Sequence, residues 1–240
     1  MINSGISDQV NYSNLKSSLK TGDVMMFMGF NPTGDAIRRL EKLEGLEGFT
    51  HIGIVVEIAD EKGNIQHYFW HAIPPDAINQ FSPDYLKGVQ ADGCVLVTLD
   101  SVIDWVKKTN TDAGRTEFKL IVRKLNGENG KRGIGPDQLK DFITFMKQMA
   151  GRSFSHPVDM GMVLDYTAGL EASKLGGKSS SNTTFFCSKL SSATFQAAKL
   201  LPESLVVNSV LPGHFGSKSK QGKLQWQKGY SLGEDIYVQP

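Results

Sequence analysis

One cysteine lies in a setting that could make it a nucleophile. Cys187 stands in TTFFCSKLSSATF, residues 183–195, between a polar run and a segment that we expect to be helical. A thiol attacks as the thiolate, and its pKa of about 8.5 falls at a helix N-terminus, where backbone N–H groups and the helix dipole favour negative charge. Ser181 to Thr184 precede Cys187 as potential helix caps. The alternative is a small core residue, as free cysteines commonly are, and this interpretation suits Cys94 in CVLVTL better.

A thiol nucleophile needs a base, most often a histidine that a third group holds in one tautomer. His51 opens the β-branched run HIGIVVEIA, and His71 lies near the end of the aromatic run IQHYFWHAI. Both runs predict strands, at 51–59 and 65–73, and the polar ADEKGN between them predicts a hairpin. The hairpin would bring the two histidines onto neighbouring strands.

The hairpin register decides whether the two histidines meet. If residues 59–63 form the loop, Ile58 pairs with Asn64 and His51 lies directly opposite His71, with Cβ atoms roughly 5 Å apart on one face. One imidazole would then orient the other. A loop shifted by one residue is expected to turn His71 to the opposite face. Glu57 shares the face of His51 but lies roughly 20 Å along the strand, too far to orient it.

Each histidine also has a simpler interpretation, because a histidine at a strand end is more often a satisfied or solvent-facing residue than a base. His67 shares a face with His71, and such a pair could bind a metal, but no carboxylate or cysteine at ligand spacing joins them. We therefore expect no metal and no cofactor. His156 and His214 fall in expected loops.

Motifs of rival chemistries are incomplete. The run GGKSS resembles the end of a phosphate-binding loop, but Ala172 stands where that loop requires glycine. The sequence has no GxSxG elbow of a serine hydrolase and no HExxH of a zinc protease. Their absence favours the cysteine interpretation.

Four motifs together resemble a known group of enzymes: GDVMMFMG, then FTHIGIVVE, then a strand that ends in WHA, and far downstream FFCSKL. They are similar to those of the circularly permuted papain-like group. That group is related to the NlpC-type cell-wall peptidases and to lecithin:retinol acyltransferase, and it includes the YiiX-type amidase-like proteins. The resemblance covers about residues 20–200, and the order of histidine before cysteine is the one that marks the permuted subgroup.

The resemblance implies a role for each matched residue. Cys187 would be the nucleophile, His51 the base and His71 the residue that orients the base, although many YiiX-like chains carry glutamate at that third position. Lys189 replaces the usual glutamate of the FCSEL pattern, on a side of the helix expected to be exposed. Asp23 could shape the seam of the site, or could simply form a turn before a strand.

The resemblance also implies the fold, a circularly permuted, NlpC-like α+β fold in which a curved antiparallel sheet packs on the nucleophile helix. The residue pattern alone favours an α+β domain over 1–240. It predicts further strands and helices, a flexible loop at about 165–184 and a polar tail from 213 to 228. The elements expected besides the hairpin are strands at 22–30, 94–99 and 117–125, helices at 35–45, 100–108, 135–151 and 187–201, and a last strand in DIYVQP.

Composition narrows the possible partners. The chain has 240 residues, 40% of them hydrophobic, and a net charge of +1, so it has no basic excess for binding nucleic acid. No stretch approaches the roughly 18 apolar residues of a membrane-spanning helix, and the first 20 residues lack an apolar leader. We expect a cytoplasmic protein, or one exported by a dedicated secretion system, with reduced thiols.

These observations predict a cysteine-dependent hydrolase or acyltransferase. It would cleave an amide or ester through a thioester acyl-enzyme, and the substrate would be a peptide, a cell-wall fragment or a lipid-like amide or ester. The alternative is a non-catalytic binding module that has kept the papain-like shell. A metal-binding regulator that uses the histidine cluster is a third reading. The sequence does not indicate an oligomeric state.

Overall fold

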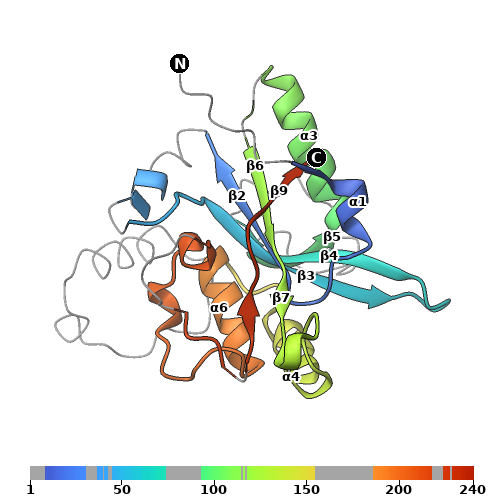
Figure 1. Ribbon diagram of the computed structural model, residues 1–240, viewed down its shortest axis with the longest axis vertical. Coiled ribbons are helices and arrows are strands. Elements are labelled where there is room, and N and C mark those ends of the chain that lie inside the picture. Colours follow the sequence, from blue (N-terminus) through green and yellow to red (C-terminus); the bar gives the residue numbers. More distant parts are fainter. Residues whose placement is uncertain are drawn as a thin grey trace.

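The structure, a computed structural model, describes residues 9–30, 37–39, 41–42, 45–73, 93–114, 116, 118–154, 186–217, 224–227 and 229–240. Its large sheet contains β1 (Val10–Asn11), β2 (Val24–Gly29), β3 (His51–Ala59), β4 (Ile65–Ile73), β5 (Gly93–Thr98), β6 (Phe118–Arg123) and β9 (Ile236–Gln239). The strand order is β1-β9-β6-β2-β3-β4-β5 (Figure 1). Every neighbouring pair is antiparallel except β1 with β9. A smaller sheet pairs β7 (Leu125–Asn126) with β8 (Ser231–Leu232).

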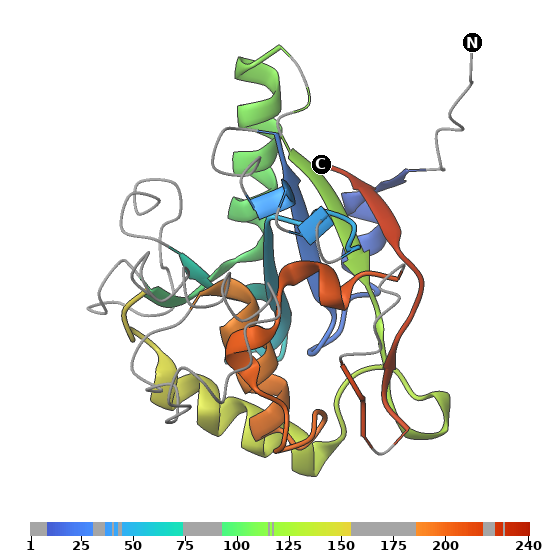
Figure 2. The ribbon, with the colours of Figure 1, turned by 90° about the vertical axis from the view of Figure 1, so that its left-hand side faces the viewer.

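Helices cover both faces of the large sheet. They are α1 (Tyr12–Lys16), α3 (Leu99–Asp112), α4 (Pro136–Met149) and α6 (Cys187–Ala197), with the 3₁₀ turns η2 (Glu128–Gly130), η3 (Val207–Ser209) and η4 (Pro212–Phe215). Figure 1 shows α4 and α6 on one side of the sheet and α1 and α3 on the other, and Figure 2 looks onto the α6 side. A sheet covered on both faces has strands that are apolar throughout, and β2 and β3 read in this way.

The two faces hold separate cores. Alternate residues of β3, such as Ile52 and Ile54, pack with Leu190 of α6 and Phe142 of α4. The intervening Val55 packs on the other face, in a cluster that includes residues of α1 and α3. The expectation of an α+β fold with a mostly antiparallel sheet is therefore confirmed, and α6 does pack on that sheet, against β3 and β4.

The predicted hairpin strands are confirmed at 51–59 and 65–73, but the predicted register is wrong. Ala59 pairs with Ile65, so Ile58 lies opposite Gln66 rather than Asn64. The loop is residues 60–64, because Asp60 Oδ1 accepts hydrogen bonds from the backbone N–H groups of Lys62 and Asn64, both at 2.8 Å.

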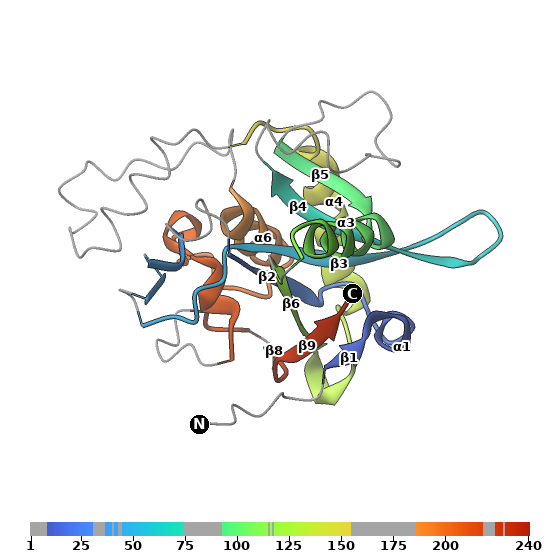
Figure 3. The same cartoon turned by 90° about the horizontal axis from the view of Figure 1, so that it is seen from above.

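The shifted loop does not turn His71 over, contrary to expectation. A loop of unchanged length that moves by one residue changes the pairing by two residues, and a shift of two preserves the face of every side chain. His71 therefore stays on the face of His51, diagonal to it rather than opposite. Figure 3 shows the hairpin of β3 and β4 reaching out past the other strands, with its loop at the far end from the histidines.

Several expected boundaries need correction. The N-cap of α3 is Thr98, whose Oγ1 accepts from Ser101 N–H at 3.4 Å, rather than Asp100. Helix α6 begins at Cys187 with Phe186 as an N-cap that makes no side-chain hydrogen bond, and it ends at Ala197 rather than near 201. The expected polar tail is buried at its start, in η4. The loop at 165–184 lies outside the described residues, as do Ser181 to Thr184.

No helix in the described ranges combines the length and apolar character needed to cross a bilayer.

Candidate active site

The large sheet opens at one end between β3 and β4. Residues 51–52 of β3 pair with β2, and residues 71–73 of β4 pair with β5, but the ladder between β3 and β4 stops at Ile54 and Trp70. Thr50 fixes the entry to β3, because its backbone N–H donates to Phe27 O at 2.7 Å and its Oγ1 accepts from Gly29 N–H at 2.9 Å. The two predicted histidines lie at this opening.

His51 and His71 are in direct contact. His51 Nε2 lies 2.9 Å from His71 Nδ1, and the two rings stand edge to face with centroids 5.2 Å apart. Both rings pack against aromatic neighbours, His51 against Phe27 at 5.4 Å and His71 against Phe69 at 4.7 Å between centroids. These neighbours restrict the orientation of both imidazoles. The expected pairing of the two histidines is therefore present, although the register differs.

Both imidazoles are neutral at physiological pH. Burial lowers the pKa of His51 to about 4, and burial together with the charge of His51 lowers the pKa of His71 well below its usual range. A neutral pair shares one proton across the 2.9 Å contact, so one ring donates and the other accepts. If His51 donates from Nε2, its Nδ1 carries a lone pair and can act as a base.

The sulfur of Cys187 lies at the same opening. Cys187 is the first residue of α6, and it is half-buried. The backbone N–H groups of Ile52, Ser188 and Cys187 face the sulfur closely enough to lower its pKa, and the N–H of Ile52 belongs to the peptide group that joins His51 to Ile52. The structure thus places the Cys187 sulfur beside the start of β3, where His51 is joined to Ile52. The first turn of α6 supplies the amides, as a helix N-terminus does.

The pKa of Cys187 is raised rather than lowered, which corrects the expectation from its position at a helix start. Burial raises it to about 11, the carboxyl group of Glu41 adds to the rise, and the three backbone amides oppose it. Desolvation of the thiolate therefore outweighs the helix N-terminus. At neutral pH the resting site holds a thiol and two neutral imidazoles.

Lys189 of α6 and Cys94 of β5 both lie in the core. Lys189 is 4% exposed, so the expectation that it sits on the exposed side of the helix is wrong. Its charge lowers the pKa of Cys94, but the burial of this cysteine has the larger effect and raises that pKa above the usual range. Cys94 is fully buried, as a core residue should be. Solvent therefore reaches Cys187 but not Cys94.

Glu41 is a site residue that sequence analysis missed. Its side chain is fully buried, its Oε1 accepts from Gly213 N–H at 2.6 Å, and its charge acts on the Cys187 thiol. Burial raises the pKa of Glu41 to about 8. The segment DAIRRLEKLEGL has Ile37, Leu40 and Leu43 three apart, as in an amphipathic helix whose charged residues face solvent, so its pattern does not predict a buried carboxyl group at Glu41.

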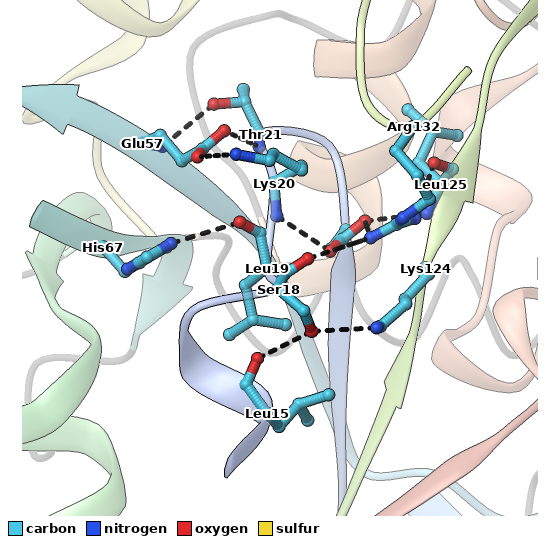
Figure 4. Close-up of polar contacts among 11 residues, drawn as sticks. Leu15, Ser18, Leu19, Lys20, Thr21, Glu57, His67, Lys124, Leu125 and Arg132 are labelled. Carbon is cyan, nitrogen blue, oxygen red and sulfur yellow. Dashed lines mark hydrogen bonds and ion pairs between the residues drawn. The ribbon is translucent and has the colours of Figure 1, made fainter. Parts of the chain in front are cut away.

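Asp23 lies at the other end of β2 and does not shape the site. Val24 pairs with Ile54, whereas Phe27 pairs with His51, so Asp23 precedes the end of β2 remote from the histidines. Figure 4 shows the polar contacts at this end, among them the ion pair of Arg132. The alternative interpretation of Asp23, as a residue of the turn before a strand, fits the structure.

The remaining histidines do not join the pair. His67 lies opposite Glu57, and its Nε2 is 3.2 Å from Leu19 O (Figure 4), which makes Nε2 the protonated nitrogen because a carbonyl only accepts. His214 is buried in η4, where Nδ1 accepts from Leu211 N–H at 2.9 Å. His156 lies outside the described residues. Within the described ranges, no three His, Cys, Asp or Glu side chains are grouped as metal ligands.

A comparison of the sequence with protein-family models gives no match, and neither does a comparison with curated proteins. The chemistry of the site therefore has to be argued from its own residues.

Proposed function

We propose that this protein is a cysteine-dependent hydrolase or acyltransferase of the permuted papain-like type, which cleaves an amide or ester through a thioester acyl-enzyme. One observation carries the proposal: the sulfur that begins α6 faces the backbone N–H of Ile52, next to His51, closely enough for that N–H to lower its pKa, and His51 is held by His71 at 2.9 Å. A nucleophile, a base and a group that orients the base are the parts that such chemistry needs.

The proton balance of the reaction follows from the neutral resting state. Because burial raises the pKa of Cys187 to about 11 and lowers that of His51 to about 4, the thiol keeps its proton until a substrate carbonyl is in place. His51 Nδ1 then takes the proton as sulfur attacks the carbonyl carbon. The imidazolium formed is stabilised by His71, and it returns the proton to the leaving amine or alcohol.

Backbone amides would stabilise the oxyanion that forms during attack. The N–H groups of Ile52, Ser188 and Cys187 face the sulfur, and Phe186 makes no side-chain cap that would occupy those of α6. Donors fixed in this way are worth about 3 kcal/mol each in related chemistry. Water, or an acceptor amine or alcohol, would then attack the thioester and release the acyl group.

The raised pKa of Cys187 favours one other function, a binding module that keeps the shell of an enzyme without turnover. A thiol that is protonated at neutral pH is a weak nucleophile unless a base assists it. The two functions therefore differ in whether an acyl group is ever transferred to the sulfur.

Trapping of the acyl-enzyme separates these functions. We expect p-nitrophenyl acetate at pH 7 to acetylate Cys187 with release of p-nitrophenolate, and mass spectrometry of the intact protein and its peptides to place the acetyl group on that sulfur. Cys94, which is fully buried, should stay unmodified and serves as the internal control. A panel of peptide and fatty-acyl esters would then report the preferred acyl group. Absence of any acyl group on Cys187 across the panel would favour the binding module.

Removal of the orienting group should slow acylation without stopping it. We expect His71→Ala to reduce the rate of acylation of Cys187 by about 10²-fold, because misplacement of a catalytic group by roughly 1 Å has a cost of this size. His67→Gln is the matched control, since His67 lies on the same strand and contacts only Leu19 O at its Nε2. An unchanged rate in His71→Ala would remove His71 from the mechanism.

A further inference from the structure

A carboxyl group connects the two halves of the candidate site. Glu41 is fully buried, and its Oε1 accepts from the N–H of Gly213 in η4 at 2.6 Å. The backbone N–H groups of Gly48 and Phe49 also face the carboxyl group closely enough to lower its pKa. Its second oxygen, Oε2, has no hydrogen bond of regular geometry among the described residues.

Each of these contacts leads directly to a residue of the site. Gly48 and Phe49 precede Thr50, which fixes the start of β3 and with it His51. On the other side, η4 follows Val210, whose carbonyl accepts from Ser188 Oγ of α6 at 2.6 Å. The carboxyl group therefore joins the segment that enters the base strand to the segment that holds the nucleophile helix.

The packing around Glu41 leaves little room for movement. A Cβ atom on Gly213 would lie 2.6 Å from Glu41 Oε2 and 2.8 Å from Leu46 Cβ, so only glycine allows this approach. Leu46 also donates from its N–H to Glu41 O at 2.8 Å. Its side chain belongs to a buried cluster with Leu211 and with Phe186, the residue before Cys187. Packing through Leu46 and Phe186 therefore connects Glu41 to the start of α6.

We propose that Glu41 is a positioning residue of the thiol site, which holds the Cys187 and His51 segments together and whose ionisation suppresses the reactivity of the thiol. This inference rests on the proposed thiol chemistry. Burial raises the pKa of Glu41 to about 8, so the group is mainly protonated at pH 7 and mainly charged above pH 9. A charged Glu41 raises the pKa of Cys187, which removes thiolate.

Other titratable groups near Glu41 are few in the described part of the chain. Glu47, six residues further along the chain, raises the pKa of Glu41. The turn η4, whose Gly213 donates to the carboxyl group, contributes His214, and Cys187 at the start of α6 is close enough for the charge of Glu41 to raise its pKa. Of these, Glu41 is the acid whose charge acts on the sulfur.

The test follows alkylation of Cys187 by iodoacetamide from pH 6.5 to 10, in wild type, Glu41→Gln and Glu47→Gln. Glutamine copies the protonated acid, so Glu41→Gln should match wild type at pH 6.5 and exceed it about threefold or more at pH 9.5, the change that half a pKa unit produces. Glu47→Gln removes a charge six residues further along the chain, and because Glu47 raises the pKa of Glu41 it should move the fall in reactivity to slightly lower pH without abolishing it. Superimposable profiles for wild type and Glu41→Gln would overturn the effect of ionisation.

A second measurement tests the positioning role. Glu41→Ala should lower the rate of acetylation of Cys187 at pH 7 about tenfold or more, whereas Glu41→Gln, which keeps the acceptor for Gly213 N–H, should stay within about twofold of wild type. Equal acetylation rates in all three proteins would contradict that role, and if Glu41→Ala fails to fold, the Glu41→Gln profile decides. Alkylation needs no turnover, so its result is independent of whether an acyl-enzyme forms.

Discussion

Replacement of Cys187 by alanine is expected to reduce hydrolysis of a short p-nitrophenyl ester by roughly 10³-fold or more, to the background rate, while the protein stays folded. The sulfur is the atom that would form the thioester, and the variant has no thiol at this position. The substitution removes one half-buried atom at the start of α6, so it should leave the helix and its core contacts in place. Initial rates and thermal unfolding of the purified variant measure the two effects.

Two further variants sharpen this result. Cys94→Ala, which removes the other thiol from a fully buried position, should keep the ester activity of wild type per folded molecule. His51→Ala should lose about as much activity as Cys187→Ala, and the double variant should lose little more, because the two residues act as one unit. Wild-type turnover by folded Cys187→Ala would refute the thiol mechanism, whatever the behaviour of the histidine variant.

The pattern of apolar and polar residues predicts the strands correctly where an apolar run is bounded by a polar turn. The run from His51 to Ala59 and the run from Ile65 to Ile73 are strands at the predicted bounds, and the two histidines share a face as predicted. The register escaped prediction because it depends on the Asx turn of Asp60, one residue beyond the predicted start of the loop. A side-chain hydrogen bond of this kind competes with the propensities that were used to place the loop.

The environment of α6 could not be predicted from its sequence. Lys189 is expected on an exposed side of the helix, yet it is buried, as are Ser188 and Ser192. Both serines satisfy their hydroxyl groups, since Ser192 Oγ donates to Ser188 O at 2.7 Å and Ser188 Oγ to Val210 O at 2.6 Å, so their burial costs little. Because residues 188–195 of α6 are all buried, the desolvation of Cys187 becomes larger than the effect of the helix N-terminus. The predicted direction of its pKa failed for this reason.

The same limit explains why the sequence does not reveal Glu41 and leaves two interpretations of Asp23 open. A carboxylate in a charged run has no pattern that reports whether its neighbours in space are water or backbone amides. Glu41 is buried by a glycine 172 residues further on, at Gly213. For Asp23, the sequence allows either a role at the seam or a turn before a strand, and the pairing of β2 with β3 decides for the turn, at the end remote from the histidines.

Loss of the Asp23 carboxylate is expected to destabilise the fold by about 3–5 kcal/mol, because it is the buried acceptor for a partly exposed arginine and for two backbone N–H groups. Asp23 is fully buried, and its Oδ2 lies 2.8 Å from Arg132 Nη2. Its oxygens also accept from the N–H groups of Lys20 at 2.9 Å and Leu125 at 2.8 Å. Asp23→Ala would leave a guanidinium and two backbone donors without their acceptor, in the cluster drawn in Figure 4.

Urea unfolding followed by tryptophan fluorescence measures this change as a shift in midpoint at constant slope. Asp112→Ala is the matched control, because its carboxylate pairs with Lys108 on an exposed helix face and should contribute less than about 0.5 kcal/mol. Asp23→Asn separates charge from hydrogen bonding: it keeps one carbonyl acceptor and should cost about 1–3 kcal/mol. A midpoint for Asp23→Ala equal to that of Asp112→Ala would mean that this cluster does not hold β2, β6 and the Arg132 segment together. Since Asp23 lies remote from the opening between β3 and β4, the ester activity of the folded fraction should stay unchanged even where stability falls.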